Sequence, residues 1–472
     1  MVDLLKGSAA LAAQSEGIQV TGSNITNVNT AGYSQENVEI SAGQTMQGPY
    51  GPEAMEVGVE GVTQARSSYL DQQVAAETAL TAAATTSQSF LTEAQTALGQ
   101  NINTSGQASS VDATGSTPVG ISGALSAFFN NFSALAATPT DPTAQANVFE
   151  QATDLANQIN QASQNLTGVQ SGITSQITSD VSSANTLLGT VASLNQQIEV
   201  AEESAPGSAL TLRDQRQEAL QQLAGYMNFQ TTPDPSGNGS LDLTVQGASG
   251  NPVTLVNSAG LESSVSFNGT SFQAGNPAVN LALTSGSLPS ELGVSTGAVQ
   301  TVQTNLSNLA SQLITSVNAA YNPSGTGSNF FAAGTGGNLL QVAPGITAST
   351  VTATATPGSG NNELATAVAA VGDQSFSTAN GDQIDGTLGG FFTSTVSNLG
   401  DQLSNATNTV SDQQLTLQQA VSQQDQVSGV SLDQQTSNLL LFQNAYQAAA
   451  QYMNTVNSML STVINGTSAT PF

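Results

Sequence analysis

The sequence has no cysteine, no histidine and no tryptophan, and its only lysine is Lys6. These absences exclude a histidine-activated cysteine or serine nucleophile, and they exclude zinc sites built from cysteine and histidine. A chain without cysteine needs no disulfide, so its redox compartment cannot be read from cysteine pairing. Carboxylate chemistry stays open, but one sequence does not place two carboxylates at the spacing that glycoside hydrolysis requires. We therefore predict no enzymatic activity, no cofactor and no metal site.

Basic residues are nearly absent from the chain. Lys6, Arg66, Arg213 and Arg216 stand against 32 acidic residues, and the formal net charge at pH 7 is −28. Because no cluster of cations is available to neutralise phosphate groups, we expect neither nucleic acid nor an anionic membrane surface as a partner. No apolar run approaches the ~18 residues of a membrane-spanning helix, so membrane insertion is not expected. A weak resemblance of the N-terminus to a signal peptide is broken by Asp3 and Lys6.

A long helical pattern fills the middle of the sequence. From Leu155 to Ile198, apolar residues recur with a mean step of about 3.6 residues, which is the period of an α-helix. One long amphipathic helix cannot bury its own apolar stripe. Further helical patterns are natural packing partners and together predict a long bundle. They lie at residues 67–100, 123–137, 208–225, 293–321 and 386–425.

Between these helical patterns the composition changes to threonine, valine, glycine and proline. Residues 226–290 contain alternating runs such as Leu241–Val245 beside a turn sequence at Pro233–Gly239, and we interpret them as a small β domain. The turn partly resembles a calcium-binding loop, but Val245 stands where such a loop needs a bidentate glutamate, so a hairpin turn is the better interpretation. Residues 322–362 are rich in glycine and predict loops with short strands.

These patterns predict a mainly α fold with a β insert. The helical bundle is long and discontinuous in sequence, because helical segments lie on both sides of the β domain. We expect five parts. They are an N-terminal helix and extended segment at 1–65, the first part of the bundle at 66–225, the β domain at 226–290, the second part of the bundle with glycine-rich loops at 291–428, and a C-terminal helix at 429–472.

Both ends of the chain carry apolar stripes of the kind that packs coiled-coil helices together. The N-terminal stripe recurs every seven residues and consists of Leu4, Leu11, Ile18 and Ile25. The C-terminal seam alternates steps of three and four and consists of Leu439, Phe442, Tyr446, Ala449, Met453, Val456, Leu460 and Val463. The ordinary core of a bundle is the alternative explanation for either pattern alone.

Three asparagines interrupt the pattern that follows the N-terminal stripe, although asparagine is a poor helix former. Asn24 and Asn27 share a helical face, and Asn29 lies near the predicted end of the helix. Gly32 is placed to take the left-handed conformation that stops a helix, and Tyr33 begins an extended run. We expect the amides to form hydrogen bonds with the backbone of a neighbouring segment. A capped helix on the surface is the alternative.

Several stretches resemble a known family. The run Asn24–Ser34 resembles the N-terminal signature of the axial proteins of the bacterial flagellum, and Ser428–Ala450 resembles their C-terminal signature. The ending Ala-Tyr-Gln-Ala-Ala-Ala and the run Leu212–Leu220 are similar to the hook-associated protein 1 family of the hook–filament junction. Two phenylalanine pairs match the same family, Phe128-Phe129 and Phe330-Phe331.

The resemblance implies a structural protein that connects hook to filament by helical self-assembly through its terminal helices. It implies a ring of copies in the axial structure, with the hook protein and the second hook–filament junction protein as neighbours. It also implies that an export chaperone binds the C-terminal helix and that the flagellar type III export apparatus delivers the chain to a secreted, extracellular location. The terminal segments of such proteins are disordered in the free subunit and fold on assembly.

On this resemblance, the assembly interface contains the N-terminal stripe, the C-terminal seam, and the group formed by Asn24, Asn27, Asn29, Gly32 and Tyr33. Two alternatives stay open. Another flagellar axial protein, such as the second junction protein or a hook protein, would share the terminal signatures. A secreted adhesin would use the β insert to bind a ligand.

Overall fold

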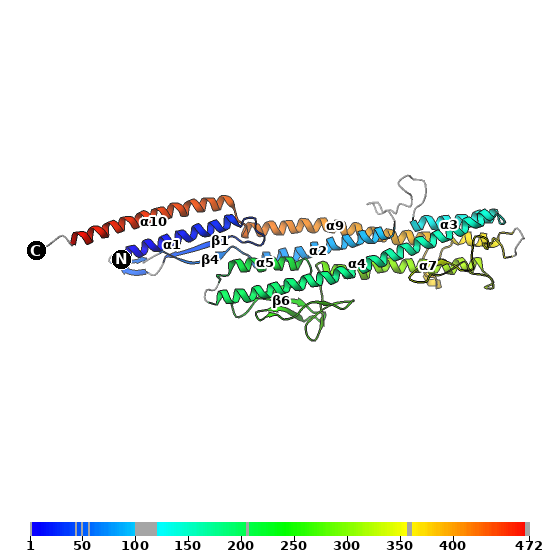
Figure 1. Ribbon diagram of the computed structural model, residues 1–472, viewed down its shortest axis with the longest axis horizontal. Helices are drawn as coiled ribbons and strands as arrows, with labels where there is room; N and C mark the ends of the chain where they lie inside the picture. The colour runs from blue at the N-terminus through cyan, green and yellow to red at the C-terminus, as the bar shows by residue number, and fades with distance from the viewer. Residues whose placement is uncertain are drawn as a thin grey trace. The chain divides into compact units, whose positions relative to one another are not determined.

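The structure is a computed structural model, and it describes residues 2–42, 45–48, 51–54, 57–99, 120–203, 207–355 and 361–467. Within these ranges the chain is mainly α-helical with small antiparallel sheets, so the predicted fold class is confirmed (Figure 1). Four of the five predicted parts include residues outside the described ranges. These residues are 1, 43–44, 49–50 and 55–56 in the first part, 100–119 and 204–206 in the second, 356–360 in the fourth and 468–472 in the fifth.

Helix α4 (Pro142–Glu202) contains the whole of the predicted long helix. The backbone N–H of Thr143 donates to the Asp141 carboxylate at 2.9 Å, and Pro142 takes the first helical position, where an N–H has no partner in the helix. Its apolar stripe is buried, as Leu155 and Leu188 illustrate. Burial of this stripe against other elements holds a helix that its three glycines would otherwise weaken.

Most of the other helices follow the remaining patterns, with ends that differ by a few residues. Helix α8 was not predicted, and α6 begins inside the segment 226–290 that was predicted as a β domain. The described helices besides α4 are α1 (Val2–Thr26), α2 (Ser68–Ala97), α3 (Gly120–Ala137), α5 (Leu210–Ala224), α6 (Ser287–Val294), α7 (Gln300–Tyr321), α8 (Glu363–Val371), α9 (Leu388–Ser428) and α10 (Leu432–Thr467). A single π-helical turn, Ser295–Val299, joins α6 to α7.

The chain divides into two compact units, and each unit is assembled from separate stretches of sequence. Unit 1 comprises Met1–Thr81, Val181–Gly286 and Gln414–Phe472, and unit 2 comprises Ala82–Asp180 and Ser287–Gln413. Helices α2, α4 and α9 supply residues to both units. The five-part division expected from the sequence stays a prediction.

The strands of unit 1 form a hairpin near the N-terminus and a β insert. In the hairpin, β1 (Glu36–Ala42) pairs with β4 (Val57–Gln64), and both contact α1. The insert consists of two antiparallel sheets with strand orders β5-β6-β7-β8 and β11-β10-β9. The remaining strands of this unit are β2 (Thr45–Gly48), β3 (Gly51–Ala54), β5 (Gln230–Pro233), β6 (Leu241–Gln246), β7 (Pro252–Asn257), β8 (Gly260–Leu261), β9 (Ser266–Phe267), β10 (Phe272–Ala274) and β11 (Val279–Asn280).

Two asparagines of α4 hold the insert by its backbone. The Asn185 amide donates to the Val265 carbonyl at 2.8 Å and accepts from the same residue's N–H at 2.8 Å. Asn195 binds Leu241 in the same way, with its amide donating to the carbonyl at 2.7 Å. Strand β5 pairs with β6 across the turn, which confirms the hairpin interpretation. Each asparagine thus satisfies a backbone donor and acceptor that would otherwise lie unpaired near the helix.

Unit 2 has an aromatic core where α3, α7 and a short hairpin meet. The hairpin pairs β12 (Phe331–Ala333) with β13 (Leu340–Val342). The Phe128 ring lies 5.1 Å from Phe132 and 5.7 Å from Phe330, between ring centroids. The side chains of all three are buried, and their edge-on or tilted arrangement is the one that aromatic pairs prefer. The two phenylalanine pairs singled out in the sequence therefore belong to one core.

Two carboxyl groups lie buried together in unit 2. Glu291 of α6 is 1% exposed and Asp180 of α4 is 8% exposed. The Asp180 carboxylate accepts from the Ser287 hydroxyl at 2.7 Å and from the Gln176 amide at 2.8 Å. Burial, together with the charge of Asp180, raises the pKa of Glu291 to about 9. At neutral pH, Glu291 is therefore the protonated partner and Asp180 accepts its hydrogen bond.

Replacing Glu291 by glutamine is expected to flatten the pH dependence of stability. Because the folded-state pKa is raised, unfolding releases a proton, and stability falls as pH rises between about 4.5 and about 9. The slope is at most about 1.4 kcal/mol per pH unit. Glutamine keeps a donor for Asp180 and does not ionise. The free energy of unfolding of Glu291→Gln, measured relative to that of the parent chain, should therefore increase steadily as pH rises above ~5.

Denaturant unfolding at several pH values measures this difference in the free energy of unfolding between the variant and the parent. Glu150 of α4 is exposed in the same unit, and Glu150→Gln serves as the matched control that should follow the parent. Parallel curves for Glu291→Gln and the parent would show that Glu291 is already ionised in the folded chain.

Candidate assembly interface

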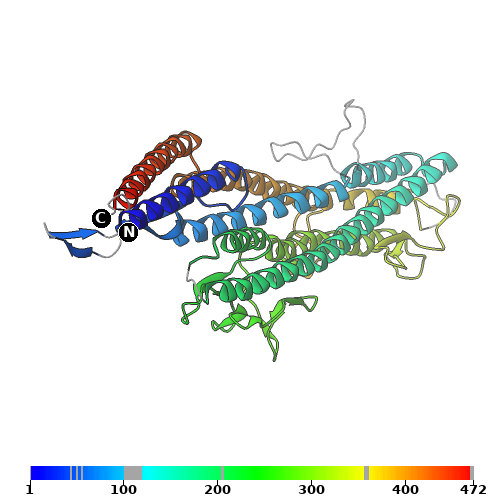
Figure 2. The same ribbon diagram turned by 60° about the vertical axis from the view of Figure 1, so that its left-hand side comes forward.

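Helices α1 and α10 lie side by side and run antiparallel (Figures 1 and 2). Two glycines of α1 allow close approach. Met453 of α10 contacts Gly7, and an added Cβ at Gly17 would lie 2.7 Å from the Phe442 ring. As the residue number rises along α1 it falls along α10, which fixes the antiparallel sense. The C-terminal seam therefore meets α1 within the same chain.

Contact with α1 divides the C-terminal seam into two parts. Its half-buried members are Leu439, Phe442, Ala449, Met453 and Val456, and its exposed members are Tyr446, Leu460 and Val463. The N-terminal stripe of Leu4, Leu11, Ile18 and Ile25 is half-buried throughout. The fully buried face of α1 runs beside that stripe and contains small residues such as Gly7, Ala13 and Gly17. Helix α10 thus lies over a face of α1 that contains small residues.

Gly17→Ala is expected to destabilise the α1–α10 pair. The new methyl group would overlap the Phe442 ring, and overpacking of this kind costs about 1–3 kcal/mol, which exceeds the helix-propensity gain of at most about 1 kcal/mol. Gly22→Ala is the control, since no heavy atom lies within 4 Å of its added Cβ. Hydrogen exchange of the α10 amides should accelerate in the first variant and not in the second. Equal protection in both variants would contradict the close approach at Gly17.

Asn24 joins three segments through one side chain that is 1% exposed. Its amide donates to the Glu36 carbonyl at 2.8 Å and to the Gln435 side-chain oxygen at 3.2 Å. Its oxygen accepts from the Glu36 N–H and from the Tyr33 hydroxyl, both at 2.9 Å. Every hydrogen-bonding position of the group is thereby used. Asn24 therefore ties α1 to β1 and to the first turn of α10.

The other two asparagines have local roles or none. The Asn27 amide donates to the Ser23 carbonyl of its own helix at 3.1 Å and accepts from Thr30 at 3.3 Å, while Asn29 is exposed. The expectation of hydrogen bonds to a neighbouring segment is thus met at Asn24, with partners from the same chain, and not at Asn27.

Gly32 and Tyr33 turn the chain from α1 into β1. Gly32 has φ of 74°, the left-handed conformation that its type predicted, and an added Cβ would lie 3.1 Å from the Asp214 carbonyl oxygen. Both constraints favour glycine. Burial raises the pKa of Tyr33, so its hydroxyl stays a neutral donor to Asn24.

Arg66 forms a second group of hydrogen bonds that joins separate segments, as Asn24 does. We call the contacts of Asn24 and those of Arg66 the two nodes. Its guanidinium donates to the Gly32 carbonyl and to Asp214, both at 2.8 Å, and to the Ser34 hydroxyl at 2.7 Å. Asp71 of α2 lies 3.8 Å away. Burial raises the pKa of Asp214 to about 6 despite the charge of Arg66. The node connects the loop after α1 with α2 and α5.

The run Leu212–Leu220 supplies three charged residues with separate tasks. Asp214 accepts from Arg66. Arg213 forms a two-point ion pair with Glu202 at the end of α4. Arg216 donates to the Asn195 side-chain oxygen and to the Gly239 carbonyl, both at 2.8 Å. Burial lowers the pKa of Arg216 to about 10. All three arginines of this acidic chain are thus engaged in internal contacts.

Several of these residues were not predicted from the sequence. Arg66 and Asp214 carried a usable signal, because each of the few cations in a strongly acidic chain is expected to pair with a buried acid. Gln435 carried no such signal, since glutamine is abundant and its partner lies 411 positions away.

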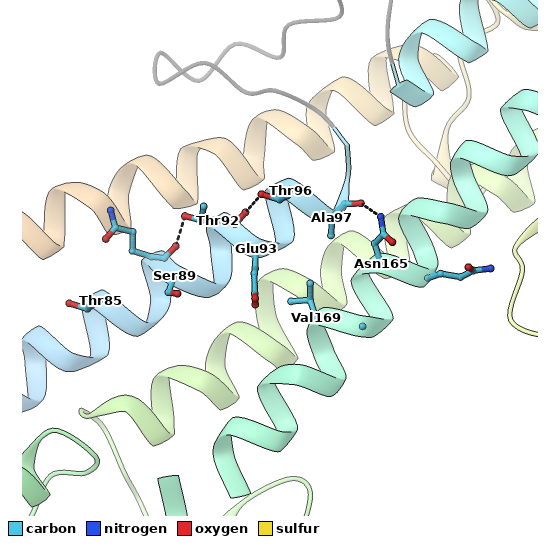
Figure 3. A pocket seen from close by; sticks show the side chains of 11 residues that line it. Thr85, Ser89, Thr92, Glu93, Thr96, Ala97, Asn165 and Val169 are labelled. Atoms are coloured by element: carbon cyan, nitrogen blue, oxygen red, sulfur yellow. Dashed lines mark hydrogen bonds between the residues drawn. The ribbon is translucent and has the colours of Figure 1, made fainter. Parts of the chain in front are cut away.

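A groove of about 850 Å³ lies between α2 and α4 in unit 2 (Figure 3). Its polar wall is already hydrogen-bonded, with Thr92 and Thr96 donating to carbonyls of their own helix and Asn165 donating to the Ala97 carbonyl at 3.2 Å. Glu93 is the one charged residue among those that line it. In the part of the chain that the structure describes, no helix is long and apolar enough to span a membrane.

Two parts of the chain match family models of flagellar proteins. Residues 421–466, which include most of α10, match the family model of the C-terminal region of flagellar basal body rod FlgEFG proteins. Residues 106–340 match the model of the flagellar hook-associated protein FlgK helical domain. The chain belongs to the FlgK family. It is accordingly a structural component of the flagellar hook–filament junction, associated with the flagellum.

Two FlgK relatives illustrate the range of similarity. The chain is 24% identical over 508 residues to flagellar hook-associated protein 1 of Bacillus subtilis (strain 168), covering 97% of this chain and 96% of that protein. The solved flagellar hook junction protein FlgK of Burkholderia pseudomallei is 22% identical, with a TM-score of 0.46 over 56% of this chain and 47% of that one.

Proposed function

We propose that this FlgK-family chain joins hook to filament by helical self-assembly through α1 and α10. The observation that carries the proposal is the incomplete burial of α10. Among the described residues, this helix packs on α1 through one side, and it exposes large apolar residues elsewhere, among them Leu441 and Met459. Covering such a side chain contributes about 1.5–3 kcal/mol. A ring of copies would supply that cover.

The contacts of Asn24 and Arg66 hold the ends of the two terminal helices in place within the chain. Asn24 and Arg66 hold the loop after α1 against β1, α2, α5 and the start of α10. Terminal helices that order on assembly would begin from these contacts. Because the ordering entropy must be offset by neighbouring copies, stray polymerisation in dilute solution is disfavoured.

The partners follow from this role. The hook protein and the second hook–filament junction protein would flank the ring. Before assembly, an export chaperone would cover α10, and the flagellar type III export apparatus would deliver the chain to the extracellular structure. The role requires no catalytic site, and the assembly residues proposed from the sequence would act with Arg66, Asp214 and Gln435.

Deleting the gene tests the proposal. Filament subunits should still be secreted, but they should be lost to the medium because no junction retains them, and a plasmid copy should restore attached filaments. Motile deletion cells with attached filaments would refute the junction role. They would favour an adhesin that uses the β insert.

A further inference from the structure

A groove of about 620 Å³ opens in unit 1 beside the loop that follows α1. Its walls come from that loop, residues 28–34, from α2, from α5 and from the last part of α9. Arg66 lines it as well, while none of the described residues that line it belongs to α10. The groove is therefore a surface separate from the contact between α1 and α10. We call it the loop groove.

The α9 wall of the loop groove combines apolar and polar side chains in a fixed order. Leu417, Val421, Asp425 and Ser428 follow one another in steps of four, four and three residues, so they share one face of the helix. Val421 is 36% exposed. A long cationic side chain fits this order, because its aliphatic part covers the two apolar residues while its charged end reaches the carboxylate.

Carboxylates outnumber cations at the loop groove. Arg66 is the one basic residue among the described residues that line it, and this cation already pairs with Asp214 and Asp71. Glu218 and Asp425 also line the groove. In the described part of the chain, neither of these two carboxylates forms an ion pair. The groove therefore attracts a positively charged group and repels an acidic one.

A buried hydroxyl on the same wall supports a hydrogen-bonding occupant independently of charge. Ser428 is 7% exposed, and its Oγ has no hydrogen-bond partner among the described residues. Its backbone carbonyl accepts from the Gln35 N–H at 2.8 Å, which fixes the position of the residue. A buried polar group left unpaired is costly. A cationic group beside Asp425 would donate a hydrogen bond to this hydroxyl as well.

We propose that the loop groove binds a segment of a different protein that carries an arginine or a lysine. This inference rests on the proposed junction function and names the chemistry by which one neighbour is recognised. A second copy is a poor source of such a segment. The three arginines of this chain already donate to internal acceptors, which leaves Lys6 as its single remaining basic residue.

A photo-crosslink identifies the occupant. Val421→p-benzoylphenylalanine, introduced into the full chain in the deletion strain, should give on illumination an adduct with a different protein. The linked residue should lie next to an arginine or a lysine, or a few positions away. If this variant does not restore filaments, the same substitution at Gln221, which lines the groove from α5, replaces it.

A leucine on the same helix provides the control position. Leu415 is 67% exposed and does not line the groove, so the same crosslinker there should not reach that segment. A product of twice the chain mass, or no product from either groove position, would overturn the proposal.

Removal of charge tests how the occupant is held. Glu218→Gln and Asp425→Asn, combined in the chain that carries the crosslinker, keep the size of the side chains and remove their charge. The adduct yield should fall about tenfold, because charged hydrogen bonds are lost. Glu203→Gln is the matched control, since Glu203 is exposed in the same unit and does not line the groove. Equal yields from the double variant and this control would overturn the proposal. Retained filaments in the deletion strain would refute the junction role instead, which separates the two failures.

Discussion

Asn24→Leu is expected to release β1 and the start of α10 from α1 while unit 2 stays folded. Leucine removes four hydrogen bonds, from the Glu36 N–H and carbonyl, the Tyr33 hydroxyl and the Gln435 side chain. Each buried polar group left unpaired costs about 1–3 kcal/mol. Together they should lower the local stability of the terminal segments by about 3–5 kcal/mol.

Hydrogen exchange followed by mass spectrometry measures this effect. Protection of residues 36–40 and 432–440 should fall by about 100-fold or more, since each 1.4 kcal/mol corresponds to a factor of ten. The aromatic core around Phe128 should exchange as in the parent. Asn29→Leu is the matched control, because Asn29 is exposed in the same stretch, and it should change nothing. If the two variants exchange alike, Asn24 does not join these segments.

Arg66→Met is expected to cause a large loss of stability in unit 1. It leaves the buried Asp214 carboxylate without its cation, and breaking a buried ion pair costs about 3–5 kcal/mol. Asp71 of α2, which lies 3.8 Å from Arg66, loses the same cation. The Gly32 carbonyl and the Ser34 hydroxyl lose their donor as well.

The pH dependence distinguishes the charge from the lost hydrogen bonds. In the parent, the pKa of Asp214 is raised to about 6, so stability falls as pH rises from its usual value of about 3.8 to about 6. Without Arg66 that pKa rises further, and the fall continues to higher pH. The difference in unfolding free energy between parent and variant should therefore be smallest near pH 4, where mainly the lost hydrogen bonds contribute, and largest above pH 7.

Denaturant unfolding at pH 4 and pH 8 measures this gap. The double variant Arg66→Met/Asp214→Asn is the control, and its gap to the parent should widen less with pH, because one of the two uncompensated carboxylates has been removed. A gap of equal size at both pH values in the single variant would show that the charge of Asp214 is not what Arg66 compensates.

Periodicity predicted the helices well because their apolar stripes are buried against other elements. The pattern from Leu155 to Ile198 became the core of α4, and the alternating run at Leu241–Val245 became β6. Glycine patterns carried less information. Gly7 and Gly17 form the face on which α10 packs, yet glycine adds nothing to a hydrophobic stripe.

Residues of the candidate site were predictable from the sequence where their type has few structural roles at such a position. Asn24 in a helix suggested a hydrogen-bonding role, and Gly32 suggested a left-handed turn. Their partners were not predictable, because the contact from Asn24 to Gln435 joins the two ends of the chain and depends on the tertiary fold.

Hydrogen exchange of α1 and α10, compared between the dilute monomer and flagella isolated with their junctions intact, tests the central claim most directly. We expect partial protection of residues 4–25 and 439–463 in the monomer, where α1 and α10 pack on each other, and an increase of about 100-fold or more in the assembled state. Strong and equal protection in both states would show that the isolated chain already covers its terminal helices, and would contradict assembly through them.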